Sequence, residues 1–159
     1  MQTMKLFFDT NVLIDYYAQQ GTLGANAYHL TIPRFFDDAR LWVSGKSFTD
    51  AFYVLKKHKD SQKLQQAMLD SLKIFDVCSL ERDDIDAACK LGWPDFEDAL
   101  IEISAQKVGA DYLITRDAGF GYVRTKARTP VCTPEEIIAI FEKRGLTYAA
   151  IDLDRLCLD

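Results

Sequence analysis

The sequence has few of the residues that build zinc sites or disulfide frameworks. It contains two histidines and four cysteines, without a C-x-x-C pair or an H-E-x-x-H motif, so we expect no zinc site. The thiols are expected to be reduced and partly buried; they are Cys78, Cys89, Cys132 and Cys157. Glycine-rich phosphate loops and the G-x-S-x-G serine motif are missing too. The chemistry must therefore come from other side chains.

Long apolar runs are also missing. No stretch approaches the ~18 apolar residues of a membrane span, and residues 1–8 lack a secretory signal pattern, so we expect a soluble, cytoplasmic chain without membrane contact. The 159 residues, of which 48% are hydrophobic and 27% charged, suit a single globular domain. We assign this domain to residues 1–145 and expect residues 146–159 to form a C-terminal tail that packs on the domain or on a partner.

Short apolar runs alternate with helical patterns along the chain. Strands are expected at residues 5–8, 41–44, 74–80, 112–115 and 131–132, and helices at 12–17, 48–55, 64–72, 83–91, 100–108 and 134–144. This alternation predicts an α/β fold, in which α-helices flank a mostly parallel central sheet of about four or five strands. Ligands of such sheets bind beyond the carboxyl ends of the strands, where the strand order reverses. Asp9 and Asp117 follow the first and fourth strands, so both are expected at this edge.

Four segments carry a family resemblance: Phe8-Asp9-Thr10-Asn11-Val12-Leu13-Ile14-Asp15, Ser47-Phe48-Thr49-Asp50, Asp95-Phe96-Glu97-Asp98-Ala99-Leu100-Ile101 and Tyr112-Leu113-Ile114-Thr115-Arg116-Asp117. In this order and spacing they resemble the PIN domain, the nuclease fold of VapC-like toxins and several RNA-processing enzymes. The resemblance covers about residues 4–142, including Thr133-Pro134-Glu135-Glu136. It implies a single PIN-like domain that hydrolyses RNA phosphodiester bonds with one or two Mg²⁺ or Mn²⁺ ions.

The resemblance also implies roles for individual residues. Asp9, Asp98 and Asp117 are the expected metal ligands, and Asp50, where the family often has Glu, completes the catalytic set. The residues expected to orient these acids are Asn11, Ser47, Asp95 and Thr115. Electrostatic repulsion also favours a metal ion among these acids. Two carboxylates about 5 Å apart repel by about 3 kcal/mol at an effective dielectric of about 20. A hard divalent cation relieves this repulsion, and Mg²⁺ prefers carboxylates with water and phosphate oxygens.

Several of these acids also have structural explanations. The segment from Ser47 to Asp50 fits a helix capping box, and Asp95 is a plausible N-cap for the helix that follows Pro94. Asp15 and Glu102 are expected to lie at the surface or to support the metal ligands.

Charge bears on the substrate and the partners. The net charge of −5 argues against a polyanionic ligand, although four acids in a metal site would account for most of the excess. We predict that RNA binds a basic patch near Asp117, formed by Arg116, Arg124, Lys126 and Arg128, and that Lys56, Lys57, Lys59 and Lys63 form a solvated face. The family suggests a homodimer and a small antitoxin protein that blocks the acidic pocket. The alternatives are a PIN nuclease without an antitoxin, a catalytically weak scaffold that binds RNA or protein, and phosphotransfer through an aspartyl intermediate, which the lack of a D-x-D motif disfavours.

Overall fold

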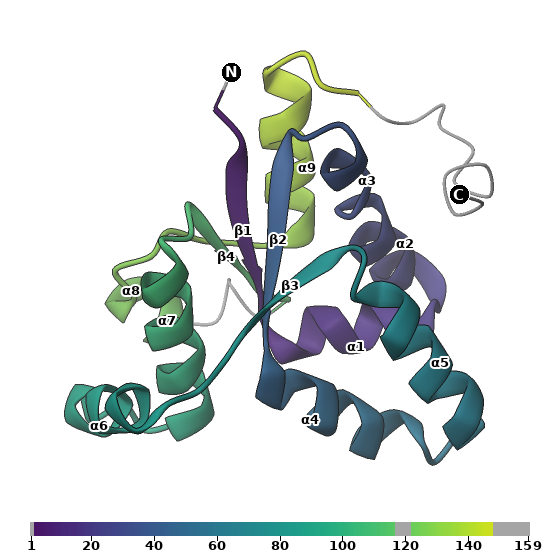
Figure 1. Cartoon of the computed structure of the whole chain (residues 1–159). Coiled ribbons are helices and arrows are strands. Elements are labelled where there is room, and N and C mark those ends of the chain that lie inside the picture. Colours follow the sequence, from purple (N-terminus) through teal and green to yellow (C-terminus); the bar gives the residue numbers. More distant parts are fainter. Residues whose placement is uncertain (1, 117–121, 148–159) are drawn as a thin grey trace.

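The computed structural model describes residues 2–116 and 122–147, and these form one parallel sheet with helices on both faces (Figure 1). The strands are β1 (Met4–Phe8), β2 (Ala39–Ser44), β3 (Phe75–Cys78), β4 (Tyr112–Ile114) and β5 (Val131–Cys132). The helices are α1 (Thr10–Ala18), α2 (Gly21–His29), α3 (Ile32–Phe35), α4 (Gly45–Leu55), α5 (Ser61–Ser71), α6 (Arg82–Leu91), α7 (Phe96–Val108), α8 (Tyr122–Lys126) and α9 (Pro134–Lys143). The predicted α/β fold with a parallel sheet is confirmed.

The end of β1 lies at the point where the order of strands in the sheet reverses. The strands lie in the order β3-β2-β1-β4-β5 and every neighbouring pair is parallel. The chain therefore moves outward from β1 through β2 to β3, and then returns to the other side of β1 as β4. A crevice forms beyond the carboxyl ends of strands at such a point. In this sheet the switch point lies between the ends of β1 and β4.

Alternate residues of the central strands pack on opposite faces of the sheet, because successive side chains of a strand point to opposite sides. Leu6 and Phe8 belong to the larger core, which α1, α2, α4, α5 and α9 complete. Phe7 and Leu113 face the smaller core beneath α7 and α8. Burial on both faces explains why β1 reads as a continuous apolar run.

Three helices were not predicted from the sequence: α2, α3 and α8. In α2, glycine has low helix propensity, yet Gly24 is needed because a Cβ there would lie 2.8 Å from the backbone carbon of Gln19. The close approach of α2 to the end of α1 thus requires a residue that weakens the helical signal. Pro33 similarly obscures α3, where it occupies one of the first helical positions. The structure also ends β3 at Cys78, earlier than predicted.

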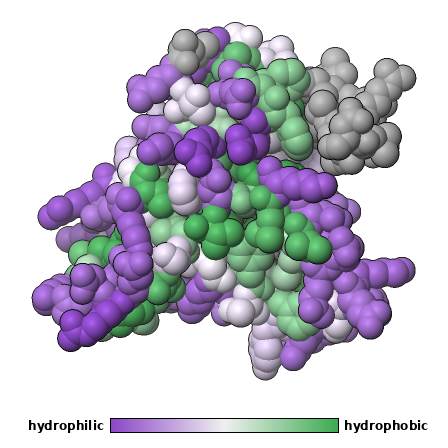
Figure 2. Space-filling model, viewed as in Figure 1, coloured by the Kyte–Doolittle hydropathy of each residue, from purple (hydrophilic) through white to green (hydrophobic). Residues whose placement is uncertain are grey.

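Figure 2 shows apolar side chains near the centre of one face of the molecule, where β3 crosses the front of the sheet in Figure 1, with hydrophilic side chains around them. Cys78 and Cys132 are buried, but Cys89 is exposed, which corrects the expectation for that thiol. Cys157 lies outside the described residues. Among the residues described, none of the helices is long and apolar enough to cross a membrane.

Asp84 provides a stability prediction at the contact between α6 and α7. Its Oδ2 accepts hydrogen bonds from Lys107 Nζ (2.8 Å) and from the Glu81 amide (2.9 Å). The Lys107 hydrogen bond, followed by that of the amide, holds the pKa of Asp84 below its ordinary value of 3.8. Because the folded-state pKa is depressed, this stabilisation is complete above the unfolded pKa and is lost as the pH falls through the folded pKa.

We therefore expect Asp84→Asn to lower the free energy of unfolding by about 1 kcal/mol at neutral pH, because Asp84 completes the capping box that Glu81 begins. Urea unfolding at about pH 7 and about pH 3 measures this difference, which should shrink at the acidic pH. A difference of the same size at both values would contradict the role of the Asp84 charge.

Candidate metal and RNA site

Asp9 lies at the carboxyl end of β1 and begins α1 as its N-cap. Its Oδ1 accepts a hydrogen bond from the Thr10 amide (2.7 Å), and its Oδ2 accepts one from Thr115 Oγ1 (2.8 Å). The Asp9 amide donates to the Ile114 carbonyl of β4 (2.9 Å). Asp9 is thus held in a defined orientation at the point where the sheet order reverses.

Thr115 and Asn11 form one hydrogen-bonded network with Asp9. Asn11 Nδ2 donates to Thr115 Oγ1 (3.1 Å), and Asn11 Oδ1 accepts from the Arg116 amide (3.2 Å). Thr115 is only 4% exposed, so its hydroxyl has little competition from solvent. Two of the four residues predicted to orient the acids are thus linked to Asp9: Thr115 contacts it directly, and Asn11 contacts Thr115.

The first turn of α4 lies against the start of α1. Ser44, and not Ser47, is the N-cap of α4, and its hydroxyl accepts from the Lys46 amide (3.3 Å). Ser47 is buried and its Oγ lies 2.8 Å from Thr10 Oγ1, within a hydrogen bond. The capping-box interpretation is thus wrong, because Asp50 stands in the second turn of α4, too far along the helix to cap it. This leaves Asp50 available for a contact outside its own helix end.

Asp95 begins α7, as the sequence predicted. Its Oδ1 accepts from the amides of Glu97 (2.9 Å) and Asp98 (3.2 Å). Glu97 and Asp98 consequently lie together in the first turn of α7, where the helix dipole favours negative charge. Both are only partly exposed. The cap formed by Asp95 thus fixes the start of α7, and with it the position of the candidate metal ligand Asp98 in the first turn.

Lys46 joins α4 to α7 and was not among the predicted site residues. Its Nζ donates to Asp50 Oδ2 and lies 4.0 Å from Glu97 Oε2. Partial burial lowers the pKa of Lys46, but the hydrogen bond to Asp50 and the charges of Glu97, Asp50 and Asp95 outweigh it and raise the pKa above its usual value. Lys46 is therefore a cation among acids. The four-residue spacing between Lys46 and Asp50 is the sequence signal that could have identified the pair.

The described residues do not by themselves complete a metal site. Among residues 2–116 and 122–147, no group of three or more histidine, cysteine, aspartate or glutamate side chains is arranged to hold a metal ion. Asp117, one of the three predicted metal ligands, lies outside these residues. The ligand set of Asp9, Asp98 and Asp117 therefore stays a prediction.

Two of the four arginine and lysine residues predicted to bind RNA are paired with acids. Arg116 Nε lies 2.9 Å from Asp15 Oδ2, and Arg124 Nη2 lies 2.8 Å from Glu136 Oε1. Arg116, Arg124, Lys126 and Arg128 are all exposed. Asp15 itself is buried, so of its two expected positions, at the surface or in support of the metal ligands, the surface one is excluded.

Glu102 is also buried, at 1% exposure, which excludes the surface position that was one of its two expected positions. Its Oε1 accepts from Gln106 Nε2 (2.6 Å) and from the amides of Arg128 (2.8 Å) and Thr129 (3.1 Å). Glu102 thus fastens the segment after α8 to α7. Its burial could have been predicted from its position on the apolar side of the predicted helix.

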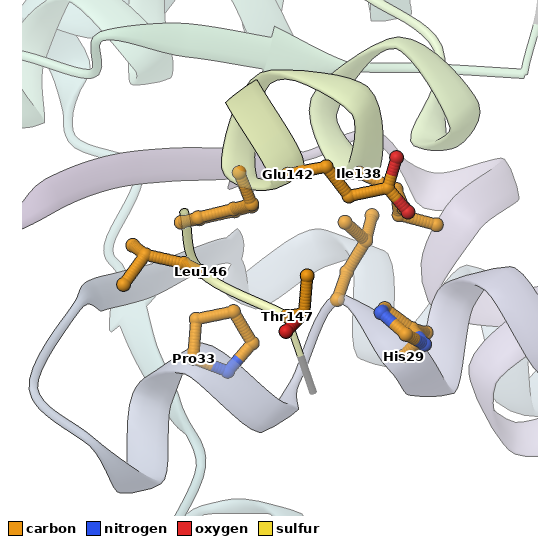
Figure 3. A pocket seen from close by; sticks show the side chains of 8 residues that line it. His29, Pro33, Ile138, Glu142, Leu146 and Thr147 are labelled. Atoms are coloured by element: carbon orange, nitrogen blue, oxygen red, sulfur yellow. The ribbon is translucent and has the colours of Figure 1, made fainter. Parts of the chain in front are cut away.

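A pocket elsewhere in the structure does not contain the predicted acids. Figure 3 shows it between α9 and the α2–α3 region, with His29, Pro33 and Glu142 among the lining residues. Leu146 and Thr147 also line it, and Leu146 packs against the larger core. The first part of the predicted tail therefore contacts the domain, whereas residues 148–159 lie outside the described residues. This pocket has no part in the acidic edge of the sheet.

Solved structures of other proteins share this fold at low sequence identity. A toxin–antitoxin complex from Klebsiella pneumoniae has a chain with 21% identity and a TM-score of 0.59, and the match covers 81% of this chain and 97% of that one. VapBC2 from Rickettsia felis, bound to a DNA fragment from its promoter, matches with 14% identity, a TM-score of 0.60 and coverages of 82% and 98%. VapC20 from Mycobacterium tuberculosis, a Sarcin-Ricin loop cleaving toxin, matches with 14% identity, a TM-score of 0.55 and coverages of 68% and 86%.

Sequence comparison gives the family. A search among curated proteins finds no significant match. A family model described as PIN domain matches residues 5–119, which include all but the first residue of β1, the whole of β2, β3 and β4, and the segments that carry Asp9, Asp50 and Asp98. The match covers well over half of the sequence, so this chain belongs to the PIN domain family.

Proposed function

We propose that this chain is a Mg²⁺- or Mn²⁺-dependent endoribonuclease that hydrolyses the phosphodiester bonds of single-stranded RNA. The observation that carries the proposal is the position of Asp9, held by Thr10 and Thr115 at the carboxyl ends of β1 and β4, where the sheet order reverses. Membership of the PIN domain family supports it, as does the shared fold with VapC20, a toxin that cleaves the Sarcin-Ricin loop.

The donor atoms at this edge suit a hard divalent ion. Asp9 and Asp98 offer carboxylate oxygens, and Mg²⁺ prefers such ligands together with water and phosphate oxygens. A carboxylate oxygen has two lone pairs, so the hydrogen bonds from Thr10 and Thr115 are compatible with metal coordination by Asp9. Asp9, Asp98 and Asp117 would hold the ion, which supplies Lewis acidity toward the phosphodiester.

The chain's own residues prepare this edge for RNA. Thr115 and Asn11 restrict the Asp9 carboxylate to one orientation, and Asp95 fixes the first turn of α7, where Asp98 lies. Orientation of this kind contributes to catalysis because the reacting groups do not have to be ordered during the reaction. We also propose that Lys126 and Arg128 contact RNA phosphates, while Arg116 and Arg124 divide their charge between RNA and their acidic partners.

Dependence on a divalent ion tests this function. Protein treated with EDTA and then freed of it should not cleave a fluorescently labelled single-stranded RNA. Addition of Mn²⁺ or Mg²⁺ should restore cleavage, because the acids at this edge repel one another and need a cation to bind phosphate. Cleavage that is equally fast in EDTA would contradict the proposed mechanism. A mixture of RNA sequences is required, since proteins often recognise single-stranded RNA by its sequence.

A second candidate function is a catalytically weak PIN-like scaffold that binds RNA or protein. It is favoured by the ion pair of Lys46 with Asp50, which engages one of the four predicted catalytic acids. A scaffold would bind RNA without cutting it at any metal concentration. The cleavage assay described above, combined with an RNA-binding measurement on the same samples, distinguishes the two functions.

We also infer that a small antitoxin protein inhibits the chain and that the chain forms a homodimer. The antitoxin inference rests on the fold shared with chains from a toxin–antitoxin complex and from VapBC2, and the homodimer is an expectation from the family resemblance. A short open reading frame beside the gene would encode the antitoxin. Its product, when co-expressed, should copurify with the chain and suppress the RNA cleavage.

A further inference from the structure

We propose that an aromatic patch at the start of α7 and α8 binds an unstacked nucleobase of single-stranded RNA, beside the acidic edge of the sheet. The aromatic patch consists of Trp93, Phe96 and Tyr122. The proposal rests on the endoribonuclease function proposed above and names the part of the RNA that this region recognises.

Contacts between distant segments bring the aromatic patch together. The Trp93 and Tyr122 rings meet edge to face, with their centroids 5.7 Å apart and their planes at 81°. Val123, the next residue of α8, packs against the smaller core that includes Ile101 of α7, so α8 is held beside α7 (Figure 1). Phe96 is the first residue of α7. Tyr122 is thus fixed at the end of α7 where Trp93 and Phe96 lie.

Packing explains Trp93 but not the other two rings. Trp93 packs on a small cluster of buried residues contributed by α6 and α7. By contrast, Phe96 is 45% exposed and Tyr122 is 43% exposed. Asp95 caps α7, so Phe96 is not needed to begin the helix. Exposed rings of this kind are the surfaces on which the bases of single-stranded nucleic acids stack.

The aromatic patch adjoins the acidic edge of the sheet. Phe96 is followed directly by Glu97 and Asp98, in the first turn of α7. Glu97 Oε2 in turn lies 4.0 Å from Lys46 Nζ, at the start of α4. The acids here outnumber the lysine, and they repel a phosphate but not an uncharged base. The chemistry of this position therefore suits a base and not the RNA backbone.

Positive charge follows the aromatic patch along α8. Arg124 and Lys126 are exposed and come two and four residues after Tyr122. Arg124 is paired with Glu136, and a cation in a surface ion pair can still attract phosphate. These cations suit the phosphates of the nucleotides next to the stacked base. A stacked base with a neutralised backbone beside it is a common way of binding single-stranded RNA.

Another exposed aromatic residue offers a comparison. Tyr53 on α4 is 62% exposed, but the ammonium groups of Lys56 and Lys57 lie 4.7 and 5.7 Å from the centroid of its ring. A cation above a ring interacts with the same face that a base would cover. Tyr53→Ala is therefore the matched control, because it removes an exposed tyrosine away from the aromatic patch.

RNA binding without metal tests the proposal, because the full-length chain then holds no ion for cleavage. Fluorescence anisotropy in EDTA compares a mixture of labelled single-stranded RNAs with an abasic strand of the same length, which keeps the phosphates but lacks the bases. We expect the wild-type chain to bind RNA at least about 5-fold more tightly than the abasic strand. Tyr122→Ala and Phe96→Ala should each weaken RNA binding by about 5- to 100-fold and leave binding of the abasic strand unchanged.

The controls separate stacking from folding. Tyr53→Ala should bind both strands like the wild-type chain, and Tyr122→Phe, which keeps the ring, should retain tight RNA binding. Tyr122→Leu replaces Tyr122→Ala if circular dichroism shows that the alanine variant does not fold. The sequence has two tryptophans, so a Trp42→Phe chain reports on Trp93 alone. RNA, but not the abasic strand, should quench its fluorescence.

Equal affinity of the wild-type chain for RNA and for the abasic strand, or unchanged RNA affinity in Tyr122→Ala and Phe96→Ala, overturns the proposal. If these variants lose a dimer in sedimentation velocity but bind RNA normally, the aromatic patch is a contact between subunits and the base-binding role is rejected. The proposed function is judged separately, by Mn²⁺-dependent cleavage. Cleavage without base-dependent binding keeps the nuclease and rejects the aromatic patch, whereas base-dependent binding without cleavage at any metal concentration does the reverse.

Discussion

Asp9→Asn is expected to reduce metal-dependent RNA cleavage by more than about 100-fold, because replacement of a residue that merely supports a metal ligand already costs about 10–100-fold. Asparagine removes the negative charge that would hold the metal ion. It keeps one carbonyl oxygen to accept from the Thr10 amide, and its amide group can donate to the Thr115 hydroxyl. The fold should therefore survive, and the melting temperature should stay close to that of the wild-type chain.

The measurement is the initial rate of cleavage of a mixture of labelled single-stranded RNAs in Mn²⁺, with circular dichroism as the test of folding. Asp111→Asn is the matched control. Asp111 lies just before β4, at the opposite edge of the sheet, and its Oδ2 accepts from the Lys5 amide (2.7 Å). This variant should cleave RNA like the wild-type chain. Equal activity of Asp9→Asn and Asp111→Asn would reject Asp9 as a metal ligand.

Glu102→Ala is expected to lower the free energy of unfolding by about 2–6 kcal/mol. The carboxylate accepts from the amides of Arg128 and Thr129, and each buried donor left without a partner costs about 1–3 kcal/mol. A second consequence follows from the position of the contact. The segment that carries Arg128 is no longer fastened to α7, so RNA affinity should also fall.

Urea unfolding at neutral pH measures the change in stability. The control is Glu142→Ala, since Glu142 is an exposed residue near the end of α9 and should change the free energy by less than about 0.5 kcal/mol. If both variants were equally stable, Glu102 would not hold the segment after α8 as described. RNA binding in the absence of metal, at fixed salt concentration, provides the independent measurement for that segment.

The elements of the sheet could be predicted because their signals are local. β1 is a short apolar run that ends at Asp9, and α9 begins with Thr133 and Glu136, whose side chains form the capping box seen in the structure. α7 ends at Gly109, which has a φ of 66° and so adopts the left-handed conformation that glycine favours. Each of these features depends on neighbouring residues in the chain. Sequence patterns can therefore locate them without knowledge of the fold.

The helices that were missed depend on contacts between distant parts of the chain. Gly24 weakens the helical signal of α2, but its lack of a side chain permits the close contact with the end of α1. The burial of Ala27 in the larger core then stabilises a helix that its own residues favour weakly. Packing outweighed propensity there, as is usual for short helices.

The sequence by itself determined the alternation of strands and helices, the position of Asp9 at a strand end and the cap formed by Asp95, because short-range geometry and hydrophobic pattern control these features. Only the tertiary structure decided that Lys46 lies beside Glu97, that Ser47 meets Thr10 and that Glu102 is buried against the segment after α8. Each of these contacts joins residues from separate helices or loops. Their energies arise from burial and charge in three dimensions, where sequence separation no longer measures distance.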